Sequence, residues 1–183
     1  EVSVDTPRKV SRETAVEIIR SIEPPAVGVM VIMPETVEEA VELYEAVRAP
    51  YMQLHGDESP KFVEELKSAV PCKIIKTVHV NEDSIKKARD YEKFANMILL
   101  DTATEKAGGS GIAHDWGISS RIVESTEIPV FLAGGLNPEN VKEARETVKP
   151  YAVDVASGVE NADGRKDVSK VEDFIRNAKG LEF

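Results

Sequence analysis

The feature that most constrains this chain is a regular alternation of short apolar runs with amphipathic segments along its length. From Ala26 onward, successive runs start 25, 21, 25, 32 and 22 residues apart. Most runs are apolar at consecutive positions, which is the pattern of parallel strands buried on both faces. We predict seven strands: Val2–Asp5, Ala26–Met33, Tyr51–His55, Cys72–Val80, Met97–Thr102, Pro129–Ala133 and Tyr151–Ala156.

The segments between these runs carry helix signals. Apolar residues of 37–48 recur every three or four positions, and a capping box, Thr36 to Glu39, precedes them. Further starts are predicted at Ser59-Pro60, Asn137-Pro138 and the capping box Ser169 to Glu172. Strands alternating with helices at this period indicate an α/β fold, either a doubly wound sheet or a TIM (βα)8 barrel. Periodicity alone does not distinguish the two.

The apolar content and net charge of the chain limit the classes of protein to which it can belong. With 183 residues and 42% apolar content the chain can bury a core, and no linker divides it, so residues 1–183 are predicted to form one domain. The 23 basic and 33 acidic side chains give a net charge of −10, which disfavours nucleic acid or an anionic membrane as partner. The sequence has no apolar run near the ~20 residues that span a bilayer. A cytoplasmic protein is expected.

Ligands of both architectures bind at the carboxyl ends of the strands. Glycine pairs with polar neighbours follow the last two predicted strands, as Gly134-Gly135 and Ser157-Gly158. Glycine lets the backbone approach a phosphate closely, and successive N–H groups then donate to its oxygens. One pair alone would more simply make a tight turn, but two pairs on consecutive late strands favour phosphate binding.

Each of the other polar residues at the carboxyl ends of the predicted strands allows two interpretations. Asp101 ends a strongly apolar strand, where a partly desolvated carboxyl suits a general acid, although a cap or ion-pair role is equally consistent. His55 could contact a ligand or make a structural hydrogen bond. Arg8 could hold a carboxylate with two hydrogen bonds, but spacing alone favours a solvated charge.

The remaining candidates indicate neither a metal nor a nucleophile. His79 and His114 have no partner at metal-ligand spacing, so no metal is expected. The single cysteine, Cys72, precludes an intramolecular disulfide and is predicted to be a core residue. The Gly-Gly-Ser-Gly segment 108–111 is too short for a phosphate-binding P-loop and is predicted to be a mobile loop over the site.

Four stretches together resemble the phosphoribosylanthranilate isomerase family. They occur in the family's order and span most of the chain. They are Met52–Glu58, Ile98–Thr102 with Gly108–Gly111 and His114–Trp116, Phe131–Val141, and Tyr151–Glu160.

The resemblance implies a TIM (βα)8 barrel in tryptophan biosynthesis. The implied reaction is the Amadori rearrangement of N-(5-phosphoribosyl)anthranilate to 1-(2-carboxyphenylamino)-1-deoxyribulose 5-phosphate, by a monomer or homodimer without metal or redox cofactor. Asp101 matches the general acid that protonates the furanose oxygen, and Arg8 matches the residue that holds the anthranilate carboxylate. The other implied contacts are Gln53, His55 and Asp154 with substrate, and Gly134, Gly135, Ser157 and Gly158 with phosphate.

The sequence also departs from the family. Family members end their first strand in a Lys-Ile-Cys-Gly-like motif whose cysteine is the general base, and Cys72 does not match it. We therefore expect about seven βα units, with the N-terminal unit missing. Ala156 replaces a common serine, and Ile112 a common lysine. Two alternatives remain, a catalytically impaired phosphosugar-binding barrel and a related histidine-pathway isomerase. The second is disfavoured because only the C-terminal half has the glycine turns.

Overall fold

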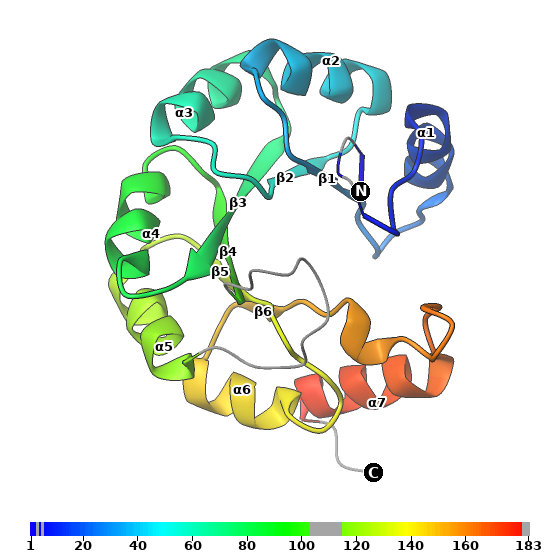
Figure 1. Ribbon diagram of the computed structural model, residues 1–183, viewed down its shortest axis with the longest axis vertical. Helices are drawn as coiled ribbons and strands as arrows, with labels where there is room; N and C mark the ends of the chain where they lie inside the picture. Colours follow the sequence, from blue (N-terminus) through cyan, green and yellow to red (C-terminus); the bar gives the residue numbers. More distant parts are fainter. Residues whose placement is uncertain (3, 5, 103–114, 181–183) are drawn as a thin grey trace. The chain divides into compact units, whose positions relative to one another are not determined.

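Strands alternate with helices throughout the computed structural model, which describes residues 1, 2, 4, 6–102 and 115–180. Figure 1 labels the elements. In chain order they are α1 (Arg12–Ser21), β1 (Val29–Ile32), α2 (Val37–Val47), β2 (Tyr51–Leu54), α3 (Pro60–Ala69), β3 (Lys73–Val80), α4 (Ser84–Glu92), β4 (Met97–Thr102), α5 (Trp116–Ser125), β5 (Val130–Leu132), α6 (Val141–Val148), β6 (Ala152–Val153), the 3₁₀ turn η1 (Ser157–Val159) and α7 (Val168–Lys179).

These elements fall into two compact units. Unit 1 comprises Glu1–Thr77 and Asp90–Ile98, and unit 2 comprises Val78–Arg89 and Leu99–Phe183. Strands β3 and β4 each begin in unit 1 and end in unit 2.

Unit 1 contains the first strands of a parallel sheet. β1 pairs with β2, with Val29 opposite Tyr51, and β2 pairs with β3, with Tyr51 opposite Lys73. Next to β3, Asn96, the residue before β4, donates its backbone N–H to the Ile74 carbonyl, and its side-chain Oδ1 accepts from the Ile74 N–H, both at 2.9 Å. The strands of unit 1 therefore lie in chain order, from β1 to the start of β4.

Unit 2 continues the same order. The Ala133 N–H, just after β5, donates to the Leu100 carbonyl of β4 at 2.7 Å, and β5 pairs in parallel with β6. The whole order is β1-β2-β3-β4-β5-β6. A doubly wound sheet reverses its strand order at a switch point. Since this order contains no reversal among the described strands, the topology is that of a (βα) barrel.

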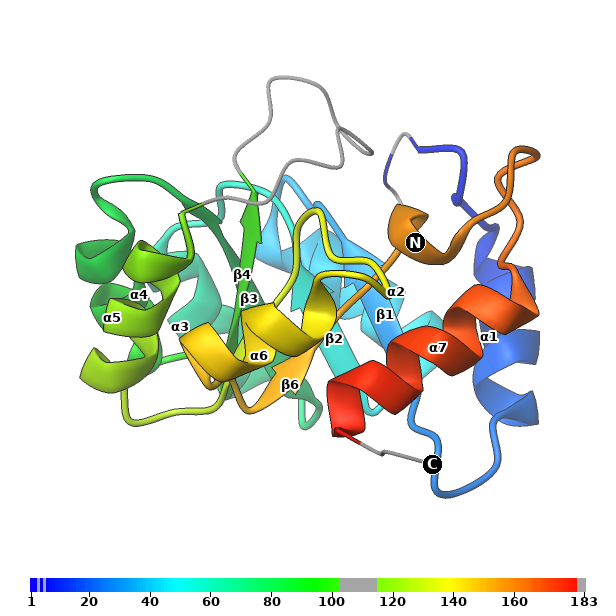
Figure 2. The same cartoon turned by 90° about the horizontal axis from the view of Figure 1, so that it is seen from below.

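Strands β3 and β4 bury consecutive side chains, as the apolar runs predicted, whereas β1 and β2 alternate buried residues with more exposed ones. In unit 1, Met52, Leu54 and Ile74 are fully buried, together with Leu43 of α2 and Leu66 of α3. Figure 1 shows α2 and α3 running alongside these strands. In unit 2, α6 packs against both α5 and α7, and the pair α6 and α7 is seen side by side in Figure 2.

Six of the seven predicted strands are present. In the first predicted strand, Val2–Asp5, the described residues Val2 and Val4 are buried but not part of a strand, and Ser3 and Asp5 lie outside the described residues. The Val2 N–H still donates to the Val31 carbonyl of β1 at 2.9 Å. The loop segment 108–111, with Ile112 and His114, also lies outside the described residues. None of the described helices is long and apolar enough to cross a membrane.

Candidate functional site

Unit 2 gathers polar residues and glycines at the carboxyl ends of three neighbouring strands. Asp101 and Thr102 end β4, Gly134 and Gly135 follow β5, and Asp154 directly follows β6. The Asp154 N–H donates to the Leu132 carbonyl at 2.8 Å, so the end of β6 is fixed beside the end of β5.

The turn after β5 lies directly against the end of β4. Gly134 has φ +82° and Gly135 has φ +67°, a backbone region that favours glycine. A Cβ atom built on Gly134 would overlap the Thr102 hydroxyl, and it would lie 2.5 Å from the Thr102 nitrogen and 2.8 Å from Asp101 Oδ1. This contact between the turn and the Asp101 carboxylate therefore requires a residue without a side chain.

A second glycine contact joins the two predicted phosphate turns. A Cβ atom on Gly158 of η1 would overlap the Leu136 carbonyl oxygen and lie 3.1 Å from the Asn137 Cα atom. The backbone of η1 thus packs on the backbone of the turn after β5. The structure brings Gly134, Gly135, Ser157 and Gly158 into one cluster with Asp101.

The turn after β5 is held by a pair of asparagines. Asn140 Nδ2 donates to the Gly135 carbonyl at 3.0 Å, and Asn140 Oδ1 accepts from the Asn137 N–H at 2.8 Å. Asn137 Oδ1 accepts in return from the Asn140 N–H at 2.9 Å. These bonds fix the backbone of the turn after β5.

Asp154 has a perturbed carboxyl group. Burial raises its pKa above the ordinary value, the negative charge of Asp101 raises it further, and Lys166 lowers it. Although solvent reaches the residue, the surrounding protein disfavours its charged form. The two carboxyl groups are thus electrostatically coupled.

Lys166 is an electrostatic neighbour of Asp154 that the sequence analysis did not single out. Its Nζ donates to the Ala156 carbonyl at 2.7 Å and pairs with Glu160 Oε1 at 2.8 Å. These contacts tie Lys166, in the loop after η1, to Ala156, the residue before η1, and to Glu160, the residue after it. Lys166 stands in a polar loop, where nothing in the spacing distinguishes it from a solvated charge.

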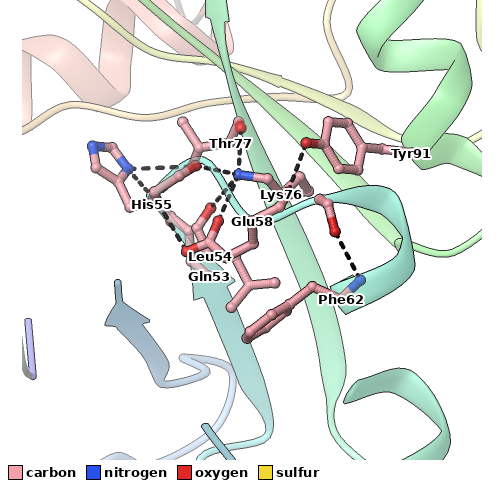
Figure 3. A network of polar contacts seen from close by, with 10 residues as sticks. Gln53, Leu54, His55, Glu58, Phe62, Lys76, Thr77 and Tyr91 are labelled. Carbon is pink, nitrogen blue, oxygen red and sulfur yellow. Dashed lines mark hydrogen bonds and ion pairs between the residues drawn. The ribbon is translucent and has the colours of Figure 1, made fainter. Parts of the chain in front are cut away.

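In unit 1, the predicted residues Gln53 and His55 lie together at the end of β2. Figure 3 shows their network with Thr77, the last residue of β3 within this unit. His55 Nδ1 lies 3.2 Å from both Gln53 Nε2 and Thr77 Oγ1, and Gln53 Nε2 lies 3.4 Å from Thr77 Oγ1. An Nδ1 atom that accepts from the amide leaves the ring proton on Nε2. Thr77, which the sequence did not single out, thereby orients the imidazole.

Arg8 lies in the turn that precedes α1. Its N–H donates to Thr6 Oγ1 at 3.2 Å, and the Thr6 hydroxyl donates to the Glu1 carboxylate. Arg8 is half-buried rather than fully solvated. The structure places it in unit 1, as it does Gln53 and His55.

Cys72 is half-buried and lies just before β3, so the prediction of a core residue is wrong. Burial raises the pKa of its thiol to about 11, so the thiol is protonated at neutral pH and is a poor nucleophile or base. Within the described part of the chain, no group of three or more His, Cys, Asp or Glu side chains could hold a metal ion.

Comparisons with known proteins agree on one family. The family model for N-(5'phosphoribosyl)anthranilate (PRA) isomerase matches residues 1–177. An N-(5'-phosphoribosyl)anthranilate isomerase from Methanocella arvoryzae is 46% identical over 177 residues, covering 95% of this chain and 83% of the relative.

Solved structures agree in fold. The phosphoribosyl anthranilate isomerase from Thermotoga maritima aligns with a TM-score of 0.86 and 38% identity, over 97% of this chain and 84% of that one. A phosphoribosyl anthranilate isomerase in complex with reduced 1-(o-carboxyphenylamino)-1-deoxyribulose 5-phosphate aligns with a TM-score of 0.81 and 35% identity, over the same shares of both chains, 97% and 84%. The barrel topology is therefore confirmed.

The glycine contact predicts an unequal response of two glycines to alanine. Gly164 also has a positive φ, of 73°, but its Cβ position is open, so Gly164→Ala should cost only the backbone strain of about 1–2 kcal/mol. Gly134→Ala adds a clash with the Thr102 backbone and should cost roughly 1–3 kcal/mol more. Urea unfolding of both variants measures the difference, and equal losses would contradict the close packing of the turn on β4.

The coupled carboxyl groups predict a pH-dependent effect of Asp154→Asn. Because the pKa of Asp154 is raised above its ordinary 3.8, the folded chain keeps this proton at pH values where the unfolded chain has lost it. Ionisation therefore lowers the stability of the wild type as pH rises through the raised pKa, and the asparagine variant avoids this loss. Unfolding free energies from about pH 4 to about pH 8 should show a growing advantage of the variant. A constant difference would show that Asp154 is not perturbed.

Proposed function

The chain belongs to the N-(5'-phosphoribosyl)anthranilate isomerase family, and we propose that it performs the family's reaction with Asp101 as the general acid. The reaction converts N-(5'-phosphoribosyl)anthranilate to 1-(2-carboxyphenylamino)-1-deoxyribulose 5-phosphate in tryptophan biosynthesis. A proton from Asp101 reaches the furanose ring oxygen as the bond between this oxygen and C1 breaks. The anthranilate nitrogen shares the positive charge that develops at C1. Loss of the C2 proton then gives an enol, which becomes the ketose when C1 gains a proton and the C2 hydroxyl loses one.

The observation that carries this proposal is the contact of Asp101 with the glycine turns. The substrate's phosphate and its ring oxygen are only a few bonds apart, so a site must offer phosphate donors and an acid close together. Gly134 lies against Asp101, and Gly158 lies against the same turn. Backbone N–H groups of this cluster supply phosphate donors without a cationic side chain.

We assign the remaining contacts on chemical grounds. The Arg8 guanidinium suits the anthranilate carboxylate, because it can donate two parallel hydrogen bonds to it. Gln53 and His55 are proposed to hold the substrate through polar contacts, and Asp154 to accept hydrogen bonds from sugar hydroxyl groups. Cys72 is not proposed as the base that removes the C2 proton, because burial raises the pKa of its thiol to about 11.

Asp101→Asn tests the assignment of the acid. Asparagine keeps the shape of the side chain but cannot donate the carboxyl proton, so turnover should fall by about 10²–10⁴-fold. Reduced 1-(o-carboxyphenylamino)-1-deoxyribulose 5-phosphate serves as the reduced product analogue, and its dissociation constant, measured by calorimetry, should change little. Asp173→Asn is the matched control, because Asp173 forms an exposed ion pair with Arg176 on α7, and it should leave both quantities unchanged.

Two results would overturn parts of this proposal. If Asp101→Asn retained most of the wild-type rate, another group would be the acid. If the wild-type chain bound the analogue but gave no turnover, the alternative of a phosphosugar-binding barrel would be correct.

A further inference from the structure

A lysine and a glutamate form a buried ion pair next to His55. Lys76 Nζ lies 2.8 Å from Glu58 Oε2, and their side chains are only 1% and 3% exposed. Moving both charges out of water is costly, and an apolar pair of similar volume often gives equal or greater stability. Stability alone therefore does not explain why charged residues occupy these positions.

The ammonium group of Lys76 also binds the backbone on both sides of His55. Its Nζ donates to the carbonyl of Gly56 at 2.6 Å, and the carbonyl of Leu54 (labelled in Figure 3) is further away, at 3.5 Å. It donates as well to the carbonyl of Thr77 at 3.0 Å, and the Thr77 hydroxyl is a partner of the His55 ring. One cation thus links the backbone that carries His55 to the residue that orients its imidazole.

Glu58 binds the other peptide group of Gly56. Its Oε1 accepts from the Gly56 N–H at 3.1 Å, while the Tyr91 hydroxyl donates to the Glu58 carbonyl at 2.7 Å. The Tyr91 ring centroid lies 5.4 Å from Lys76 Nζ, within the range of a cation–π contact. Both peptide groups of Gly56, and hence the turn after β2, are fixed by this pair.

We propose that Lys76, together with Glu58, is a positioning residue that holds His55 and Gln53 in the geometry that binds substrate. The inference rests on the proposed function, because it assumes that these two side chains contact the substrate. Lys76 acts through the backbone of residues 54–56 and through Thr77, and has no direct contact with substrate in this account. A purely structural pair would influence stability alone.

Two variants separate positioning from stability. Lys76→Met leaves Glu58 buried without its cation and should lower the unfolding free energy. Lys76→Met with Glu58→Gln removes both charges and keeps an acceptor for the Gly56 N–H, so it should recover most of that stability. Neither variant restores the Lys76 ammonium group that donates to both the Gly56 and Thr77 carbonyls, so both should shift the His55 ring signals in ¹H–¹⁵N NMR. Both should also weaken binding of the reduced product analogue by about tenfold or more.

An exposed pair provides the control. Lys61→Met with Glu65→Gln removes a surface pair on α3, whose side chains are 82% and 53% exposed, and should leave the ring signals and the affinity unchanged. The proposal is overturned if the Lys76 and Glu58 double variant shows wild-type His55 signals and affinity. If the wild-type chain does not bind the analogue, the proposed function fails, and the His55 signals of the double variant still decide whether Lys76 positions this side chain.

Discussion

The close approach of Gly134 to the end of β4 is the constraint on which the candidate site depends. Because this residue has no Cβ atom, the turn after β5 can rest on the Thr102 backbone and beside the Asp101 carboxylate. Gly158 repeats the arrangement one strand further, against the carbonyl of Leu136. Backbone thus packs on backbone twice. In the proposed function, these contacts bring backbone N–H donors for the phosphate close to the acid without any cationic side chain. A side chain at either glycine would then move the proposed phosphate donors away from the proposed acid.

The two units hold their functional residues by different physical means. In unit 2, glycine contacts and the asparagine pair of the turn fix the backbone, and the carboxyl group of Asp154 is perturbed by burial and by Asp101. In unit 1, a buried cation fixes the backbone around His55. Both arrangements lie at the carboxyl ends of strands, which is where (βα) barrels bind their ligands.

The fold was largely predictable because its determinants are local. The apolar run 97–102 coincides with β4, and Thr36 and Ser59 cap α2 and α3 through hydrogen bonds within four residues. The predicted start was wrong for two helices. Asp167, not Ser169, caps α7, which begins at Val168. Helix α6 begins at Val141 rather than near Asn137-Pro138, because Asn137 and Asn140 first close a turn. The sequence also placed Asp101 and the glycine turns at the carboxyl ends of strands, where the structure has them, and their functional roles stay predictions. Lys76 was not found from the sequence, because a lysine within an apolar strand gives no sign of its partner Glu58, which lies in the turn after β2.

A crystal structure of this chain with reduced 1-(o-carboxyphenylamino)-1-deoxyribulose 5-phosphate would show whether the glycine turns bind phosphate next to the acid. We expect the phosphate to accept hydrogen bonds from backbone N–H groups of the turns at Gly135 and Gly158. We also expect the Asp101 carboxylate to lie within hydrogen-bonding distance of the oxygen that derives from the furanose ring. A phosphate bound away from these turns, or an Asp101 carboxylate without contact to the ligand, would contradict the proposed function.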